Sequence, residues 1–304
     1  ELQDDGGVLN GGDDTSPSVT FRITVTDVND EPSFSSGGDV GVLEDSGAYS
    51  APWAGSIVMG PADESGQTGT FNITGNTNPG LFAVAPAIEA DTGDQSFTPA
   101  PNANGVSSIT IELQDDGGTA DGGVDTSGSA VFTISVGTVN DAPSFTTGGN
   151  VTVNEDSGPY DAAWASAISP GPADESGQGL TFNVSGNTNP GLFAVAPTVS
   201  GETGNLSFTP AANANGSADI TVELQDDGGV ANGGDDTGTA VVFTITLDAV
   251  NDAPSFVGGG NVTVDEDTGA YSAPWASAIT PGPADESGQS VTFNITSNEG
   301  GIAQ

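Results

Sequence analysis

An all-β protein built from tandem repeats is the fold class that the sequence predicts, and two observations support it. The first is a strict repeat of 111 residues, and the second is an apolar period of two inside each repeat. Three motifs mark the repeat: ELQDDGG at Glu1, Glu112 and Glu223, VND at Val28, Val139 and Val250, and PADESGQ at Pro61, Pro172 and Pro283. A unit of this length is too long for a propeller blade or a solenoid turn, so each copy is expected to be a domain.

The aromatic residues keep the same period as the motifs. Trp53, Trp164 and Trp275 are equivalent, and all 13 phenylalanines fall into five equivalent sets. High charge and only 34% hydrophobic residues are otherwise typical of disorder. A disordered chain has no reason to keep large rings in register, whereas burial of each ring stabilises a core. The sequence therefore predicts folded domains.

Strands are indicated by short alternating segments separated by clusters of Gly, Pro, Asn and Asp. The range 19–26 places Val, Phe, Ile and Val on one face and polar residues on the other. Similar alternation occurs at Ile109, Ile111 and Leu113, at Val40 and Val42, at Phe71 and Ile73, and at Phe82 and Val84. About seven such strands and no helical period in roughly 100 residues fit a seven-stranded, immunoglobulin-like β-sandwich.

The boundary between repeats is expected directly after VND, because Pro32, Pro143 and Pro254 follow two residues later and stiffen the connection. The chain then contains the C-terminal part of a repeat at 1–30 and the N-terminal part of another at 253–304. Complete repeats occupy 31–141 and 142–252. We expect a linear rod of sandwiches cut from a longer molecule.

The charge of the chain excludes several classes of partner and site. There are 42 acidic residues against one basic residue, Arg22, with no cysteine and no histidine, for a formal charge of −41. Disulfides and the usual zinc or iron–sulfur ligands are missing. Nucleic acid and anionic membrane surfaces require basic side chains, and no apolar run is long enough to insert into a bilayer.

Catalysis is not predicted for this chain. Without His, Cys or Lys, only carboxylates or hydroxyls remain as reactive groups. Any such pair would recur in every repeat, which suits a scaffold better than an active site. We expect a protein that is not an enzyme.

Several motifs together resemble a known family. The chain contains VNDAPSF at the repeat boundary, EDSG at Glu155, PNANG with Asn102 and Asn104, AANANG with Asn213 and Asn215, and ELQDDGG. In this combination it is similar to the bacterial cadherin-like, immunoglobulin-like "VNDAP" repeats of giant surface adhesins, and the likeness covers the whole chain. The resemblance implies extracellular proteins, secreted or attached to the cell surface, that are often calcium-dependent.

Pairs of acidic residues at the predicted strand ends are candidate ligands for calcium (Ca2+), which prefers six to eight oxygen atoms. The cadherin resemblance implies that ions bind at the joints between repeats. The joint between the complete repeats would use Glu44, Asn140, Asp141, Asp174 or Glu175, and Asp226 or Asp227. The preceding joint would use Asn29, Asp30, Asp63 or Glu64, and Asp115 or Asp116, and the following joint Glu155, Asn251, Asp252, Asp285 and Glu286.

Two departures from the cadherin pattern reduce the expected number of ions. The LDRE segment of cadherins has no counterpart, and the first Asp of the DxND motif is present only as Asp27, since Thr138 and Ala249 replace it. One or two ions per joint are therefore expected. The alternative is that these acids are solvated turn residues that hydrogen-bond their own loops.

The leading hypothesis for function is an extender or fibre segment of a secreted or cell-surface bacterial protein that supports adhesion. Its partners would be calcium ions and neighbouring repeats of the same or identical chains. The alternative is a subunit of an extracellular filament or surface layer built by contacts between sandwiches. A carbohydrate-binding module would require an aromatic surface on one repeat that the others lack, and the two complete repeats do not differ in this way.

Overall fold

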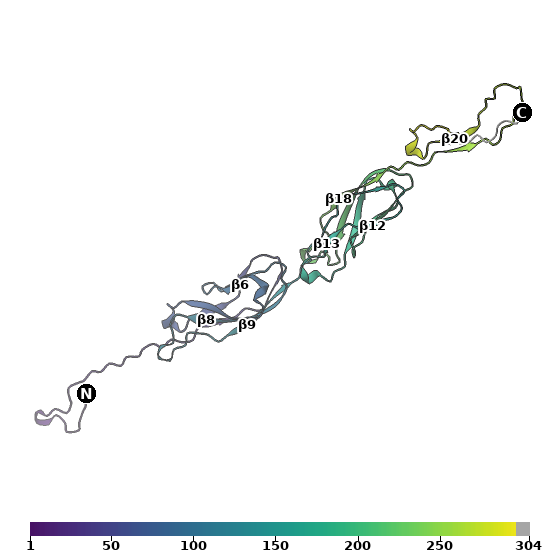
Figure 1. Ribbon diagram of the computed structural model, residues 1–304. Coiled ribbons are helices and arrows are strands. Elements are labelled where there is room, and N and C mark those ends of the chain that lie inside the picture. The colour runs from purple at the N-terminus through teal and green to yellow at the C-terminus, as the bar shows by residue number, and fades with distance from the viewer. Residues whose placement is uncertain (296–304) are drawn as a thin grey trace. The chain divides into compact units, whose positions relative to one another are not determined.

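The computed structural model describes residues 1–295 and divides the chain into two compact units, Glu1–Thr138 and Val139–Gln304. Each contains one complete sandwich (Figure 1), here named the first and the second sandwich. The described secondary structure consists of strands and short 3-10 turns, so the predicted all-β class is confirmed. Among residues 1–295 no helix has the length and apolar character needed to cross a membrane.

The first sandwich contains nine strands: β1 (Ser33–Ser35), β2 (Val40–Leu43), β3 (Tyr49–Pro52), β4 (Gly55–Val58), β5 (Gly69–Asn76), β6 (Phe82–Ile88), β7 (Asp94–Pro99), β8 (Gly105–Asp115) and β9 (Ala130–Gly137). One sheet has the order β2-β9-β8-β5 and the other β3-β7-β6. These two sheets supply the seven predicted strands. The short pair β1-β4 is additional.

The second sandwich has the same topology. Its strands are β10 (Ser144–Thr146), β11 (Val151–Asn154), β12 (Tyr160–Ala163), β13 (Ser166–Ser169), β14 (Thr181–Asn187), β15 (Phe193–Val199), β16 (Asn205–Pro210), β17 (Gly216–Gln225) and β18 (Val241–Asp248). The pairs β2-β9 and β11-β18 are parallel, whereas the other described strand pairs are antiparallel. The same unit continues with β19 (Ser255–Gly258) and β20 (Ala276–Thr280).

The predicted alternation places the core between the two sheets of each sandwich. Ile109, Ile111 and Leu113 of β8 are fully buried. Trp53 packs on Phe132 with ring centroids 4.4 Å apart, and its indole N–H donates to the Gly38 carbonyl at 2.9 Å. Each buried tryptophan thus gains apolar contact while its one donor is satisfied.

Two predictions about strands are wrong. The range 19–26 forms no strand, and Val19, Phe21, Ile23 and Val25 are 76–85% exposed, although the equivalent residues form β9 and β18. Within the described residues no strand pairs with this segment, so the apolar period alone does not fold it. Val84 does not share a buried face with Phe82, because the register shifts between them and leaves Val84 58% exposed.

Candidate functional site

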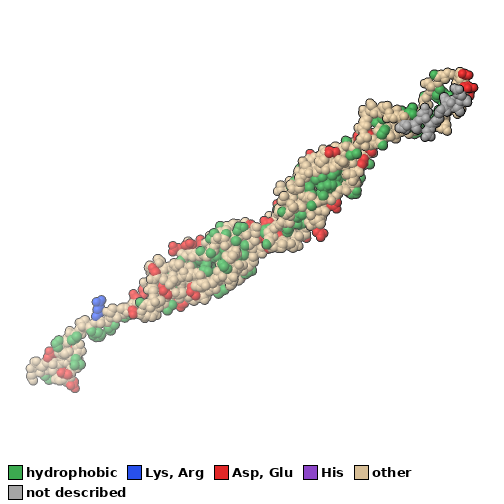
Figure 2. All heavy atoms as spheres, in the orientation of Figure 1, with side chains coloured by type: hydrophobic (Ala, Val, Ile, Leu, Met, Phe, Trp, Pro, Cys, Tyr) green, Lys and Arg blue, Asp and Glu red, His purple; other side chains and the backbone are tan. Residues whose placement is uncertain are grey.

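Acidic side chains gather where the VND segment meets the loops of the following sandwich. Figure 2 shows the red carboxylates on the surfaces of both units and a single blue basic side chain. In the second unit the turn η5 (Ala173–Glu175) follows β13, and the turn after β17 carries the two aspartates of ELQDDGG, Asp226 and Asp227. Strand ends bring these loops to the same edge as Asn140, so residues distant in sequence become neighbours.

Asn140 lies at the centre of this cluster in the second unit. Its Nδ2 donates to Asp226 Oδ1 at 3.0 Å and to the Asp235 carbonyl at 2.7 Å, while its Oδ1 accepts from Gln178 Nε2 at 2.7 Å. The backbone N–H of Asp141 donates to Glu175 Oε1 at 2.8 Å. The VND segment is therefore fixed to two loops of the sandwich that follows it.

The same network recurs in the first unit. Asn29 Nδ2 donates to Asp115 Oδ1 at 3.0 Å, and the Asp30 N–H donates to Glu64 Oε1 at 2.9 Å. A cavity of about 350 Å³ opens here, lined by Asp27, Asn29, Asp63, Glu64, Gly66, Gln67 and Gly117. Because the network repeats with similar distances, it is a built feature of the repeat rather than an accident of one loop.

A third cluster joins the second sandwich to the segment that follows it. The Val250 N–H donates to Glu155 Oε1 at 2.8 Å, and the Asp252 N–H donates to Glu286 Oε1 at 2.5 Å. Asn215 Nδ2 lies 3.4 Å from Glu155 Oε2 and 3.3 Å from Asp285 Oδ2. Carboxylates from both sides of this repeat boundary thus lie together within one unit.

Buried carboxylate oxygens without a hydrogen-bond donor are the most informative feature of the three clusters. They are Oε2 of Glu64, Glu175 and Glu286, and Oδ2 of Asp115, Asp226 and Asp252. Except for Asp252, whose side chain is half-buried, these residues are at least nine-tenths buried. An unpaired charged oxygen is costly to bury, so a site of this kind is expected to interact with a cation.

Glycine makes room for each of the three unpaired glutamate oxygens. A Cβ on Gly60, Gly171 or Gly282 would lie 1.6–1.7 Å from the Oε2 atom of the glutamate four residues later. Any larger residue would displace that carboxylate. The short turn that begins at each PAD motif therefore holds the glutamate in a defined position.

Charge repulsion and burial oppose ionisation at two of these groups. Burial raises the pKa of Glu175, and the charges of Asp141, Asp174 and Asp226 raise it further. Burial also raises the pKa of Asp252, with additional repulsion from Asp156 and Glu286. Both shifts are those expected of carboxylates crowded together without a compensating cation.

Other predicted ligands are placed differently. Asp116 accepts hydrogen bonds from the N–H and hydroxyl of Thr68, which hold its pKa below the ordinary value, and Asp227 accepts from the Gly179 N–H at 2.8 Å. These two acids fit the alternative of turn residues. Asn251 is exposed and donates to the Asp252 carbonyl at 2.9 Å.

Glu44 is 2% exposed and belongs to the first unit. Its Oε2 accepts from Asn104 Nδ2 at 3.3 Å, and its N–H donates to the Gly137 carbonyl at 2.9 Å. Glu44 therefore lies at the edge of the sandwich where β9 ends.

Sequence reasoning missed the amide side chains that organise the clusters. Gln67 and Gln178 orient Asn29 and Asn140, and Asn215 contacts carboxylates on both sides of a repeat boundary. The signal was present in the recurring PADESGQ and NANG motifs, but amides carry no charge and did not stand out among 42 acids.

The donor set fits a hard cation, but the side chains as placed do not form a closed metal cage. Within residues 1–295 no group of three or more His, Cys, Asp or Glu side chains converges closely enough to hold an ion. All the candidate donors are oxygen atoms, the preference of calcium and magnesium. Two observations favour this fit: the unpaired buried oxygens, and the space that Gly60, Gly171 and Gly282 leave beside the glutamate carboxylates.

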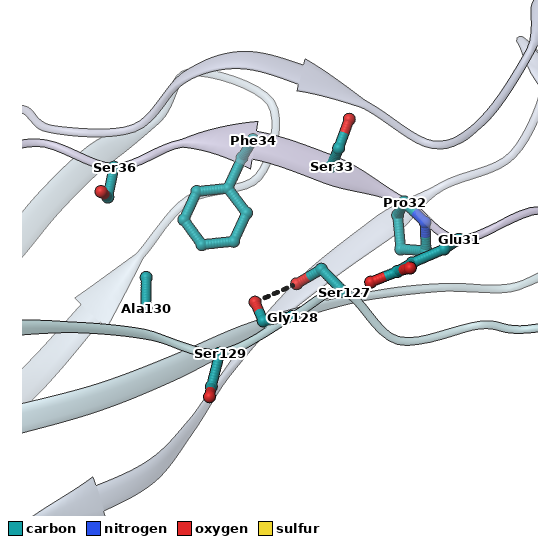
Figure 3. A pocket seen from close by; sticks show the side chains of 9 residues that line it. All are labelled: Glu31, Pro32, Ser33, Phe34, Ser36, Ser127, Gly128, Ser129 and Ala130. Atoms are coloured by element: carbon teal, nitrogen blue, oxygen red, sulfur yellow. Dashed lines mark hydrogen bonds between the residues drawn. The ribbon is translucent and has the colours of Figure 1, made fainter.

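A separate cavity of about 420 Å³ lies between β1 and residues 127–130 (Figure 3). Phe34 and Ala130 give it an apolar part, and its one carboxylate belongs to Glu31. With a single acid, this cavity does not share the chemistry of the three clusters.

Comparison with known proteins gives matches of structure only. No protein-family model and no curated protein sequence matches the chain. The structure is similar to human Protocadherin-24 EC1-2 (form II), with 17% identity over 72% of this chain and 99% of that chain and a TM-score of 0.45. It is also similar to human CDH23 EC21-23, with 17% identity over 75% of this chain and 73% of that chain and a TM-score of 0.44.

Proposed function

We propose that this chain is an extender segment of a secreted or cell-surface protein, and that calcium stiffens it at the joints between repeats. The supporting observation is the recurrent set of buried carboxylate oxygens that lack hydrogen-bond donors at the repeat boundaries. The sandwiches would act as rigid links and the VND segments as hinges. The role is mechanical and would hold a binding domain away from the cell.

Within each unit, the residues that would hold the ion are those with unpaired oxygens. These are Glu64 and Asp115 in the first unit, and Glu175, Asp226, Asp252 and Glu286 in the second. A bound calcium ion would neutralise the repulsion that raises the pKa of Glu175 and Asp252. The amides of Asn29 and Asn140 would keep the VND segment against these carboxylates.

Thermal unfolding of the chain in EDTA and in calcium tests the proposal, with sodium chloride added to equalise ionic strength. At a calcium concentration of ~100 Kd a one-site domain gains about 2.7 kcal/mol. For a domain of roughly 100 residues this corresponds to an increase of roughly 10 °C or more in Tm. Equal melting temperatures in EDTA and calcium would overturn the proposed function.

A further inference from the structure

The two complete sandwiches share one fold but differ in the quality of their cores. The clearest difference is at Gln95 on β7, which is fully buried and whose Nε2 and Oε1 atoms have no hydrogen-bond partner. The equivalent residue on β16 is Leu206, which is equally buried and belongs to the core cluster of the second sandwich. A buried amide without partners loses its hydrogen bonds to water and gains none in return.

A second difference occurs where the β5 and β14 strands begin. The first sandwich has Gly69, and a Cβ there would lie 2.4 Å from Met59 Cε, so the flexible methionine fills the space. The second sandwich has Leu180 at the equivalent position, and this side chain packs against the core. Glycine and methionine lose more conformational freedom on folding than residues that fill the same space rigidly.

The cavity of Figure 3 is a third difference. In the first sandwich Ser127 and Ala130 line it. The equivalent of Ala130 is the larger Val241, and both pack against the core of their own sandwich, while the equivalent of Ser127 is Gly238. A Cβ on Gly238 would lie 2.4 Å from the Pro143 carbonyl oxygen, so the two segments touch in the second sandwich, at a place where the first has space of about 420 Å³.

Some differences favour the first sandwich, and most of them are single methylenes. Ile73, Ile88 and the fully buried Ile111 each have one methylene more than their equivalents Val184, Val199 and Val222. At the end of β2 the half-buried Leu43 stands where the second sandwich has the exposed Asn154. In the opposite direction, Leu247 has one more than Val136. Single methylenes contribute less than the desolvation of a whole amide group.

We infer that the first sandwich is the weak link of this chain, and that it opens before the second. Gln95 is the main determinant. The two otherwise similar sandwiches thereby differ in stability. An extender under load would lengthen first at the first sandwich. This inference stands apart from the proposed calcium sites, because Gln95 lies in the core and not at a joint.

Hydrogen-exchange mass spectrometry of the full chain tests the inference, since amide protection measures the free energy of local opening. Peptides from β8 and β17 report on the two sandwiches. We expect β8 to exchange at least ~10-fold faster than β17, in EDTA and in calcium. Gln95→Leu should slow amide exchange of β8 by about 10-fold and leave that of β17 unchanged.

The control is Val106→Leu, which changes a 57% exposed side chain on β8 itself and should leave exchange of the rest of the strand unchanged. The reciprocal variant, Leu206→Gln, should accelerate amide exchange of β17. If that variant does not fold, Gln95→Leu alone still decides, because it removes a destabilising group. Equal protection of β8 and β17, or no effect of Gln95→Leu, would overturn the inference. Failure of calcium to bind would leave it intact.

Discussion

At the scale of single residues, the buried glutamate of each PADESGQ motif carries the most information. Glu175 has one oxygen held by the Asp141 N–H and a second with no donor. Such a residue costs stability unless a cation pairs with the free oxygen. The Glu175 carboxylate should therefore destabilise the fold without calcium and stabilise it when calcium is bound.

Substitution of Glu175 by Gln tests this change of sign. The folded-state pKa of Glu175 is raised, so the folded state binds its proton more tightly than the unfolded state does. The ionised side chain therefore costs stability at pH 7, and this cost disappears as the pH falls through the raised pKa toward the ordinary value of 4.5. In EDTA at pH 7, Glu175→Gln should melt a few degrees higher than the unchanged chain.

In calcium the same variant should bind the ion more weakly and melt lower than the unchanged chain. Calorimetric titration and melting curves at pH 7 and pH 4 give these quantities. Glu202→Gln, a change in an exposed loop of the same unit, is the matched control. A lower melting temperature for Glu175→Gln in EDTA at pH 7 would contradict this assignment.

At the scale of elements, the short turn after β13 positions the glutamate. Gly171→Ala should weaken calcium binding by roughly 10-fold, as is typical when a group that orients a ligand is disturbed. The new Cβ would lie 1.7 Å from Glu175 Oε2, whereas the control Gly177→Ala meets no atom within 4 Å. Equal calcium affinities for the two variants, measured by calorimetry, would show that the space left by Gly171 beside Glu175 does not matter for calcium binding.

The register shift between Phe82 and Val84 in β6 leads to a second prediction at this scale. Val84 is 58% exposed and Ile111 is fully buried, although both belong to alternating apolar segments. Val84→Thr should change the free energy of unfolding by no more than about 0.5 kcal/mol. Ile111→Thr should cost ~2 kcal/mol or more, because it removes packing and buries a hydroxyl. Urea denaturation of both variants distinguishes them, and a large loss for Val84→Thr would contradict the observed register.

The sequence predicted those strands whose apolar period is unbroken, such as β8, and it predicted the in-phase aromatic core. It could not predict the turn of Val84 outward, because a register shift leaves no trace in the alternation of residue types. It also overestimated the range 19–26, where a strand needs a neighbour in space and not only a pattern. The acids of the clusters were found from their repetition, whereas the amides of Gln178 and Asn215 required coordinates.

At the scale of the whole molecule, the charge of −41 is the dominant property. Salt screens such repulsion generally, but an ion bound between carboxylates acts at a defined place. We therefore predict that calcium changes the joints beyond the effect of ionic strength, while each sandwich keeps its fold.

Small-angle X-ray scattering of the chain in calcium and in EDTA, at equal ionic strength, tests this central claim most directly. We expect a larger maximum dimension and a narrower distribution of conformations in calcium, because the hinges become fixed. Addition of excess EDTA to the calcium-loaded chain should reverse the change. An unchanged maximum dimension and an unchanged distribution in the two conditions would show that calcium does not stiffen the joints.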